Sequence, residues 1–472
     1  MPLTFDIERV QRLIPRYAIA GPRYTSYPTV PAWKDGFGAA EHVHALQSLP
    51  IDVPVSLYVH VPFCQSLCHF CACNRVITKN PDLPERYLVA LARELELTRN
   101  TIGAELPCRQ LHWGGGTPTH LTPAQIEWLF VSITKNFRIS PDAEISIEVD
   151  PRVTTLEQIK VLAACGFNRI SMGVQDTNPK TQAAIHRIQP FEQTRELTEA
   201  ARRFGIERVN YDLIYGLPHQ TAASFSETLD AVLSARPDRI ALYGYAHVTW
   251  VAKQQRGFER GDLPSPSRRI EIFLSAVLRL EEAGYRSIGM DHFALPEDEL
   301  SQALDHGSLR RNFMGYTTHE GVDLLGFGPS AISEFSNCYS QAEKNLDDWF
   351  ERIESGAFAT SKGHQMSNDD LARRWIISRI MCEMGVSGAE VEGLFGGNYL
   401  RDYDASLARL QPLQDDGLID VNSRGDLSVR PLGKLFLRHA AMAFDAYLDH
   451  SRPAGDAVSG KQEQKNTFSQ TI

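Results

Sequence analysis

Between about residue 53 and residue 330, short runs of β-branched and aromatic residues alternate with amphipathic stretches. The six predicted strands are Val55–Val61, Arg109–Trp113, Glu144–Val149, Asn168–Val174, Arg208–Tyr215 and Arg239–Tyr245. The five predicted helices between them are Pro84–Arg99, Pro123–Phe137, Leu156–Cys165, Phe191–Phe204 and Ala222–Ala235. In the first helix the apolar residues, such as Leu88, Leu91 and Leu95, mostly recur at three- or four-residue intervals, which is typical of one buried face. Strand–helix alternation at about 30-residue intervals predicts parallel βαβ units.

Six such units favour an α/β fold built as a partial (β/α)6 barrel, although the pattern alone leaves a flat sheet open. In parallel α/β folds, ligands bind at the carboxyl ends of the strands. Chemically active residues gather there in this sequence: the cysteines from Cys64, Gly114–Pro118, Glu148 with Asp150, Gln175 with Asp176, Asp212, and Tyr245–His247. Their convergence predicts a functional site at this edge of the sheet.

The segments outside the barrel divide the rest of the chain. We expect an N-terminal extension at 1–50, the barrel at 51–335, a mainly helical C-terminal domain at 360–450, and a polar, disordered tail at 451–472. A break around 357–368 separates the barrel from the C-terminal block. That block is predicted to hold helices Leu371–Met384, Tyr403–Leu413 and Gly433–Leu448, with a hairpin formed by Gly417–Val421 and Leu427–Val429. Helices followed by a short hairpin suggest a winged-helix-like module.

Charge and hydropathy then narrow the function. The chain has 472 residues, with 48 Lys and Arg against 58 Asp and Glu, for a net charge of −10. This balance argues against a general nucleic-acid binder, which needs a basic surface. A small anionic substrate remains compatible, because a local arginine cluster can oppose the overall sign. No apolar run approaches the ~20 residues of a membrane span, and no secretory signal is evident, so we expect a cytoplasmic protein with reduced thiols.

The cysteines are clustered. Four of the eight lie within ten residues, at Cys64, Cys68, Cys71 and Cys73. The spacing of the first three indicates metal ligation or redox chemistry. A structural zinc needs four ligands; Cys73 and His69 could join in principle, but neighbours on so short a loop do not easily all face one ion. Three thiolates on one loop suit an iron–sulfur cube with one open iron.

This spacing is the signature of the radical S-adenosylmethionine (SAM) enzymes. The surrounding sequence resembles one family among them, the oxygen-independent coproporphyrinogen III oxidases, over roughly residues 20 to 450. The matching segments are Arg23–Thr29, Ser56–Asn74, His112–Thr119, Ile145–Arg152, Ser171–Asp176, Asp212–Pro218, Tyr245–His247, Gly289–Ala294, Arg311–Thr318 and Ser330–Ser333.

The resemblance implies two kinds of cofactor. Cys64, Cys68 and Cys71 would hold a [4Fe–4S] cluster, whose fourth iron binds the amino and carboxylate groups of S-adenosylmethionine. Positions matching contacts to this first S-adenosylmethionine are Tyr58, Gly115, Glu148 and Ile332. Positions matching contacts to a second one are Phe70, Gly116, Thr117, Gln175, Arg187, Asp212 and Ala246. Candidate catalytic groups beside the cluster are His60 and Cys73.

Each of these residues also has a purely structural interpretation. Gly114–Gly116 could be a tight turn, Glu148 and Asp212 could be capping carboxylates, and His60 could be a hydrogen-bonded histidine at a strand end. Pro329 departs from the expected pattern, because we expect a small aliphatic residue there, beside Ile332.

The implied reaction is anaerobic. A 5′-deoxyadenosyl radical takes a hydrogen atom from a propionate of coproporphyrinogen III, and loss of CO₂ and one electron leaves a vinyl group. Rings A and B react in turn, giving protoporphyrinogen IX. We expect a monomer that uses a flavodoxin- or ferredoxin-like one-electron donor, an unspecified electron acceptor, no nucleic acid and no membrane span. The substrate's propionates require a local cationic pocket. The candidates are Arg310 and Arg311, which could instead be surface charges, and Arg311 is favoured because it lies in a matching segment.

Two alternatives share the cysteine motif. Heme-binding, chaperone-like relatives generally lack the fourth cysteine and the segment matching Arg23–Thr29, and both are present here. A radical enzyme acting on another tetrapyrrole would diverge in the substrate-facing segments, so the matches at Gly289–Ala294 and Arg311–Thr318 weigh against it.

Overall fold

A computed structural model describes residues 7–33, 36–249, 252–319 and 322–448. The tail predicted to be disordered, 451–472, lies outside these ranges. The largest feature of the fold is a 12-stranded sheet, with the order β16-β15-β14-β13-β1-β4-β5-β6-β7-β8-β10-β9. Within it, seven strands run parallel: β13 (Leu324–Phe327), β1 (Val55–Val61), β4 (Pro107–Gly115), β5 (Arg138–Val149), β6 (Arg169–Gln175), β7 (Arg208–Tyr215) and β8 (Arg239–Gly244). All six predicted strands are confirmed. The fold is the predicted partial barrel, because antiparallel strands extend both edges and the sheet does not close.

The two edges are made by elements that the alternation did not predict. On one side β14 (Ile332–Glu334), β15 (Cys338–Ala342) and β16 (Thr360–Gln365) add antiparallel strands, and on the other β10 (His292–Ala294) and β9 (Arg286–Gly289) do so. The predicted break at 357–368 therefore contains a strand. Gly363 allows this pairing, since a Cβ there would lie 2.2 Å from the Tyr339 carbonyl.

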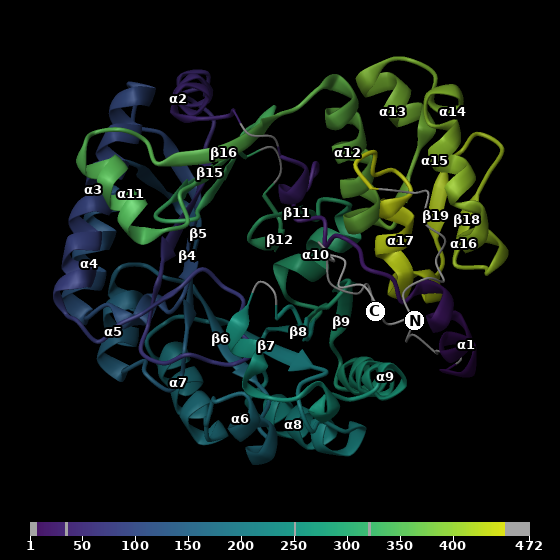
Figure 1. Cartoon of the computed structure of the whole chain (residues 1–472), viewed down its shortest axis with the longest axis horizontal. Coiled ribbons are helices and arrows are strands. Elements are labelled where there is room, and N and C mark those ends of the chain that lie inside the picture. Colours follow the sequence, from purple (N-terminus) through teal and green to yellow (C-terminus); the bar gives the residue numbers. More distant parts are fainter. Residues whose placement is uncertain (1–6, 34–35, 250–251, 320–321, 449–472) are drawn as a thin grey trace.

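Helices cover the outer face of the parallel strands (Figure 1). The five predicted helices are confirmed as α3 (Asp82–Ile102), α4 (Pro123–Thr134), α5 (Leu156–Ala164), α7 (Phe191–Arg203) and α8 (Ala222–Ala235). The remaining elements of this part are α2 (Ala39–Gln47), β2 (Phe63–Cys64), β3 (Val76–Ile77), α6 (Pro179–Ala184), α9 (Pro266–Glu282), α10 (Glu299–His306), β11 (Arg310–Asn312), β12 (Gly315–Thr317) and α11 (Leu346–Glu354). Buried residues such as Leu91, Trp113 and Ile147 form the core between helices and sheet, while polar residues alternate on the inner face.

The C-terminal elements lie beside the barrel (Figure 1). They are α12 (Asn368–Glu383), β17 (Gly385–Val386), α13 (Gly388–Phe395), α14 (Tyr399–Asp402), α15 (Asp404–Arg409), α16 (Gln411–Asp415), β18 (Ile419–Val421), β19 (Leu427–Val429) and α17 (Leu437–Met442). The small antiparallel sheet β17-β19-β18 joins β17, which lies between α12 and α13, to the predicted hairpin, which follows α16. The winged-helix-like character of this part stays a prediction.

Two helix predictions in this part were too long. The stretch 403–413 is divided into α15 and α16, and Pro412, which has no N–H to continue a helix, lies at the first turn of α16. The stretch 433–448 begins as a 3₁₀ turn, Pro431–Phe436, and is α-helical only over Leu437–Met442. Gly433 packs directly on β18, where a Cβ would lie 1.9 Å from the Leu418 carbonyl, and this contact sets the tighter turn.

The N-terminal extension is held between the barrel and the C-terminal elements. Helix α1 (Ile7–Tyr17) buries Val10 and Ile14 against α9. Further along, Arg23 donates to Asp291 at 2.7 Å, and Tyr24 donates to Asp445 at 2.9 Å. A second hydrophobic core joins residues of the N-terminal extension, of β9 and of α12. The domain boundaries at 50, 335 and 360 stay predictions. No helix of the described segments has the length and apolar character to cross a bilayer.

One carboxyl group is buried beneath the sheet. Glu94 on α3 accepts hydrogen bonds from the Gly328 amide at 2.7 Å and from the Trp349 indole at 3.4 Å. Gly328 belongs to the turn between β13 and β14, which also contains Pro329 and leads to Ile332. Burial raises the pKa of Glu94 to about 7, from its ordinary value of 4.5.

We predict that this carboxyl group makes stability depend on pH. The unfolded chain loses the proton near pH 4.5 and the folded chain near pH 7, so the free energy of unfolding falls as pH rises across this window, by up to about 3 kcal/mol. Glu94→Gln should flatten that slope in denaturant titrations at pH 4.5 to 8. Glu96→Gln, exposed on the same helix, is the control, and equal slopes in all three proteins would contradict the prediction.

Candidate functional site

The clustered cysteines lie on one loop at the carboxyl end of β1. Cys64 ends the short strand β2, whose pairing with β3 closes the loop from 65 to 75. Within the loop, the Cys71 amide donates to the Cys68 carbonyl at 3.2 Å. Cys68 is buried, Cys64 and Cys71 are half-buried, and Cys73 is exposed. All four are free thiols. They lie at the carboxyl end of β1, where a ligand site was predicted.

Polar groups surround the three sulfur atoms of the motif. Cys64 Sγ lies 3.5 Å from the Thr117 hydroxyl, and Cys68 Sγ lies 3.4 Å from an Arg152 nitrogen and 3.6 Å from one of Arg187. A hydrogen bond from the Cys73 side chain, with the charges of Arg75 and Arg187, lowers the pKa of Cys71 to about 6. Burial raises the pKa of Cys64 to about 11, and the charges of Cys71 and Cys68 act in the same direction. The three thiols therefore lie close enough to influence one another.

The chemistry of the donor groups on this loop suits an iron–sulfur cluster. Among the described residues, no three His, Cys, Asp or Glu side chains converge tightly enough to hold one metal ion. An iron–sulfur cube is much larger than one ion, so its thiolate ligands stand further apart. The loop, with three free thiols and two guanidinium groups at its inner side, fits such a cube.

The glycine turn after β4 packs directly against this loop. The Gly116 amide donates to the Val61 carbonyl and the Thr117 amide to the Phe63 carbonyl, both at 2.8 Å. A Cβ on Gly116 would lie 2.6 Å from the Pro62 carbonyl oxygen, closer than real Cβ atoms approach. Gly115 has φ +119°, which favours glycine. These glycines are therefore required by the close approach of β4 to the cysteine loop.

The four residues expected at the first S-adenosylmethionine lie on the neighbouring strands β1, β4 and β5 and on β14. Glu148 on β5 accepts from the Gly115 amide at 3.2 Å, and its other oxygen is 3.5 Å from the His112 ring. Although burial opposes ionisation, these contacts hold the pKa of Glu148 below its usual value. Tyr58 pairs in register with Gly326, where a Cβ would lie 2.5 Å from the Ile332 carbonyl. The structure thus brings all four residues to one part of the inner face.

His60 is fully engaged in hydrogen bonds. Its Nε2 lies 2.8 Å from the Asn74 carbonyl, and its Nδ1 lies 3.0 Å from the Tyr58 hydroxyl. Because a carbonyl only accepts, Nε2 carries the proton and Nδ1 accepts from Tyr58. Burial lowers the pKa of His60, so the ring is neutral. It links the first strand to the cysteine loop, which is the structural alternative considered for it.

The residues expected at the second S-adenosylmethionine form a neighbouring group. Arg187 donates to Asp150 at 3.0 Å and to the Gly173 carbonyl at 2.7 Å, while its Nε is buried with no partner among the described residues. Gln175, at the end of β6, has φ +65° and its side chain lies over Gly173. Asp212 on β7 accepts from Ser171 at 3.0 Å. Burial, reinforced by the charge of Glu148, raises the pKa of Asp212 to about 7.

Two residues of this site were missed from the sequence. Gln255, which is 1% exposed, donates to the Phe70 carbonyl at 2.9 Å and to the Ala246 carbonyl at 3.1 Å. It therefore ties the cysteine loop to the segment after β8. Arg152 donates to Asp150 at 2.6 Å and also reaches Cys68. Arg152 lies within a segment that matches the family, and this match could have identified it as a site residue. No sequence feature identifies Gln255 as a site residue.

Comparisons with known proteins agree with this geometry. The family model of the radical SAM superfamily matches residues 58–232. Oxygen-independent coproporphyrinogen III oxidase of Pseudomonas aeruginosa is 42% identical over 440 residues, which cover 92% of this chain and 95% of the relative. The Helicobacter pylori protein of the same name is 40% identical over 449 residues, covering 94% and 97%.

A solved structure extends the similarity to the fold. It is coproporphyrinogen III oxidase from Escherichia coli, described as a radical SAM enzyme, with a TM-score of 0.87 and 41% identity. The match covers 90% of this chain and 98% of that one. Because near-complete relatives agree in sequence and in fold, this chain belongs to the family of oxygen-independent coproporphyrinogen III oxidases within the radical SAM superfamily.

Proposed function

We propose that this protein converts coproporphyrinogen III to protoporphyrinogen IX by oxidative decarboxylation of two propionates, in heme biosynthesis. The observation that carries the proposal is the loop with three free thiols at the carboxyl end of β1, packed against a polar inner face. The substrate is inferred from the family to which the chain belongs.

The residues present fit the two cofactors that the family implies. Cys64, Cys68 and Cys71 would hold the [4Fe–4S] cluster, and S-adenosylmethionine would bind beside it. When bound, these groups supply a carbon-centred radical that removes a hydrogen atom from a substrate propionate. Glu148, held ionised by His112 and Gly115, would bind a cationic amino group, with Tyr58, Gly115 and Ile332 around it. Arg187, with its buried unpartnered Nε, would bind a carboxylate of the second molecule.

Other residues position this site rather than react. His60 uses both ring nitrogens in hydrogen bonds, so we assign it to fixing Tyr58 and the cysteine loop. Cys73 donates to Cys71, and we assign it to supporting that sulfur. The second binding site would be completed by Asp212, Gln175, Phe70, Gly116, Thr117 and Ala246. Gln255 would fix the backbone at Phe70 and Ala246 through its two hydrogen bonds. The lumen would keep the reacting carbon away from bulk water.

The partners and the location remain part of this proposal. The reaction needs one electron at a time, so we propose a flavodoxin- or ferredoxin-like donor, which would approach the exposed Cys73 side of the loop. A separate acceptor must take an electron after each decarboxylation. We propose that the protein works as a monomer in the cytoplasm.

An anaerobic assay tests the function. We expect reconstituted protein, with reductant and S-adenosylmethionine, to release two CO₂ per coproporphyrinogen III and to yield protoporphyrinogen IX by mass. Formation of 5′-deoxyadenosine with unchanged porphyrinogen would show that another substrate is used. If the reconstituted protein showed no cluster absorbance at ~400 nm, the proposal of radical chemistry would be wrong.

A further inference from the structure

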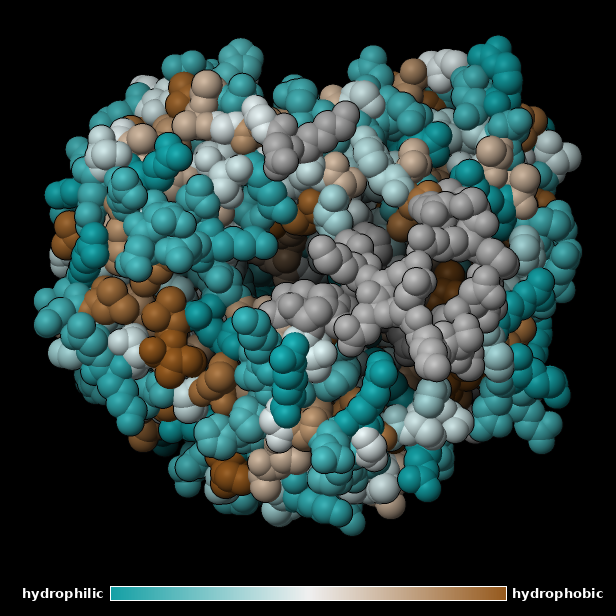
Figure 2. All heavy atoms as spheres, in the orientation of Figure 1, coloured by the Kyte–Doolittle hydropathy of each residue, from teal (hydrophilic) through white to brown (hydrophobic). Residues whose placement is uncertain are grey.

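A large cavity opens between the barrel and the C-terminal elements. Its volume is about 920 Å³, and its walls come from the segment 24–27, from β11 and β12, from residues 322–323 just before β13, from β14, and from α12 and α13. Figure 2 shows that hydrophilic residues cover much of the face of the molecule seen in Figure 1. The cysteine loop does not contribute to these walls. The cavity therefore lies away from the thiols.

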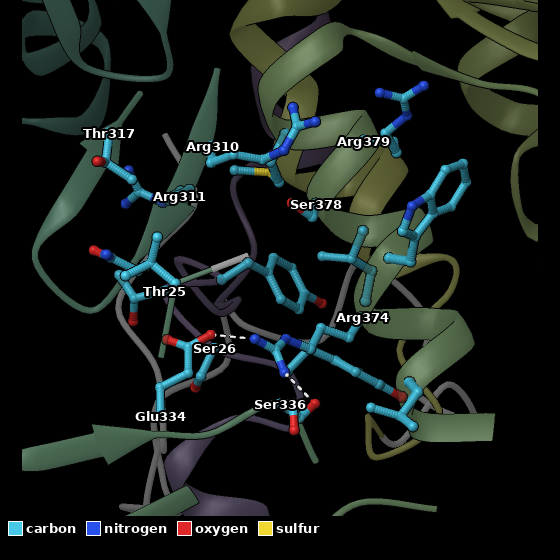
Figure 3. A pocket seen from close by; sticks show the side chains of 18 of the residues that line it. Thr25, Ser26, Arg310, Arg311, Thr317, Glu334, Ser336, Arg374, Ser378 and Arg379 are labelled. Atoms are coloured by element: carbon cyan, nitrogen blue, oxygen red, sulfur yellow. Dashed lines mark hydrogen bonds and ion pairs between the residues drawn. The ribbon is translucent and has the colours of Figure 1, made fainter. Parts of the chain in front are cut away.

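Most arginines around this cavity are already neutralised (Figure 3). Arg374 pairs with Glu334 and also donates to the Ser336 carbonyl at 3.3 Å. Arg310 lies 2.9 Å from Glu383, and Arg379 contacts the same carboxylate and, at 3.3 Å, Glu390. A ligand carboxylate would have to break an existing ion pair to use any of these.

Arg311 differs from them. Its Nε and Nη1 atoms are buried and have no hydrogen-bond partner among the described residues. Its guanidinium lies 4.6 Å from the centre of the Tyr316 ring, and Figure 3 shows it beside Thr317 on one wall. The nearby carboxylate of Asp291 already accepts from Arg23 at 2.7 Å and from His292 at 2.8 Å. A buried guanidinium left without an acceptor is costly, so this geometry points to a carboxylate ligand.

A row of rings connects Arg311 to the barrel lumen. The Tyr316 ring lies 5.2 Å from His292, which lies 5.8 Å from Tyr243 on β8. Tyr243 pairs in register with Ile214 on β7, two residues beyond Asp212. A continuous series of ring contacts therefore links Arg311 to β8, next to the strand that carries Asp212.

Arg311 and the cysteines lie at opposite ends of β1. Thr317, next to the residue that pairs with Arg311, accepts from Gln110 at 3.4 Å, and Gln110 pairs with Ser56 at the start of β1. The cysteine loop follows the other end of this seven-residue strand, which at ~3.3 Å per residue is about 20 Å long. That length is comparable to the width of a tetrapyrrole with extended propionates.

We propose that Arg311 binds the propionate of the pyrrole ring opposite the one being decarboxylated. This rests on the proposed function and assigns the far end of its substrate. A propionate held by Arg311 is too distant from the cysteine loop to react there. Rings A and C are opposite, as are B and D, so Arg311 would hold ring C while A reacts and ring D while B reacts. Each held propionate is one that the product retains.

The test measures KM for two substrates, coproporphyrinogen III and the tripropionate intermediate that already carries one vinyl group. Arg311→Met removes a charge-assisted hydrogen bond, so KM should rise about 10- to 100-fold for both substrates, by similar factors. Arg311→Lys, which keeps the charge, should recover part of the loss and guards against misfolding of the first variant. The matched control is Arg279→Met, because Arg279 on α9 makes an exposed ion pair with Asp230 on α8.

The outcomes separate the two proposals. A wild-type protein that releases no CO₂ overturns the proposed function and this assignment with it. A wild type that reacts normally, beside Arg311 variants with unchanged KM, overturns this assignment alone. A rise in KM for coproporphyrinogen III but not for the tripropionate would mean that Arg311 binds the ring A propionate, which the intermediate lacks, and this result also contradicts the assignment.

Discussion

Replacing any one of Cys64, Cys68 or Cys71 by alanine is expected to abolish the reaction. The three thiols stand on one loop, and each has its own environment: Thr117 beside Cys64, two arginines beside Cys68, and Cys73 beside Cys71. Only thiolates bind iron strongly in such a cluster. With two ligands left, the variant should lose both the cluster absorbance and the cleavage of S-adenosylmethionine, which are measured by iron analysis and by 5′-deoxyadenosine release.

Two other cysteines provide the contrast. Cys165→Ala, at the C-terminal end of α5 and away from the loop, should keep its iron and its activity. Cys73→Ser should keep its iron as well, because three ligands remain, but with weaker activity from the lost support of Cys71. Full iron loading in Cys71→Ala together with loss of iron in Cys73→Ser would show that the ligand assignment is wrong.

Gly116→Ala is expected to lower kcat/KM by about 100-fold or more. A Cβ at this position would meet the Pro62 and Phe63 carbonyl oxygens at 2.6 and 2.7 Å, and both belong to backbone that cannot rotate away. The end of β4 must then move off the segment that leads into Cys64. Displacements of about 1 Å at a reacting site cost about two orders of magnitude in rate.

The matched control is Gly261→Ala. A Cβ on Gly261 would meet no other atom within 4 Å, so this position should tolerate alanine with unchanged kinetics. We expect Gly116→Ala to remain folded in thermal melts while its kcat/KM falls. If both alanine variants matched the wild type in kcat/KM, the close approach of β4 to the cysteine loop would not be functionally required.

The barrel could be predicted because its signals are local. Each strand such as Val55–Val61 and each helix such as Ala222–Ala235 has its periodicity written in consecutive residues. The cysteine spacing is also a local signal, because all three thiols lie within eight consecutive residues that follow one strand. The candidate site residues came from the family resemblance, and several of them, such as Glu148 and Gln175, lie at the carboxyl ends of strands that the pattern also predicted.

The predictions that were wrong or incomplete concern features that depend on contacts between distant parts of the chain. The 3₁₀ turn at Pro431–Phe436 depends on packing of Gly433 against β18, and β16 depends on pairing with β15. Both are decided by contacts that periodicity does not carry. Gln255 was missed for the same reason, because its role consists of hydrogen bonds to Phe70 and Ala246, one of which is 185 residues away in the chain.

The sequence by itself determined the α/β alternation, the cysteine motif and the family to which it points, since each is encoded in runs of neighbouring residues. Only the tertiary structure decided which charges are satisfied. Arg310, Arg311, Arg374 and Arg379 look equivalent along the chain, yet three meet carboxylates and the guanidinium of Arg311 is left with two buried nitrogens unpaired among the described residues. Pairing depends on which side chains the fold brings within a few ångströms, and these partners come from distant elements.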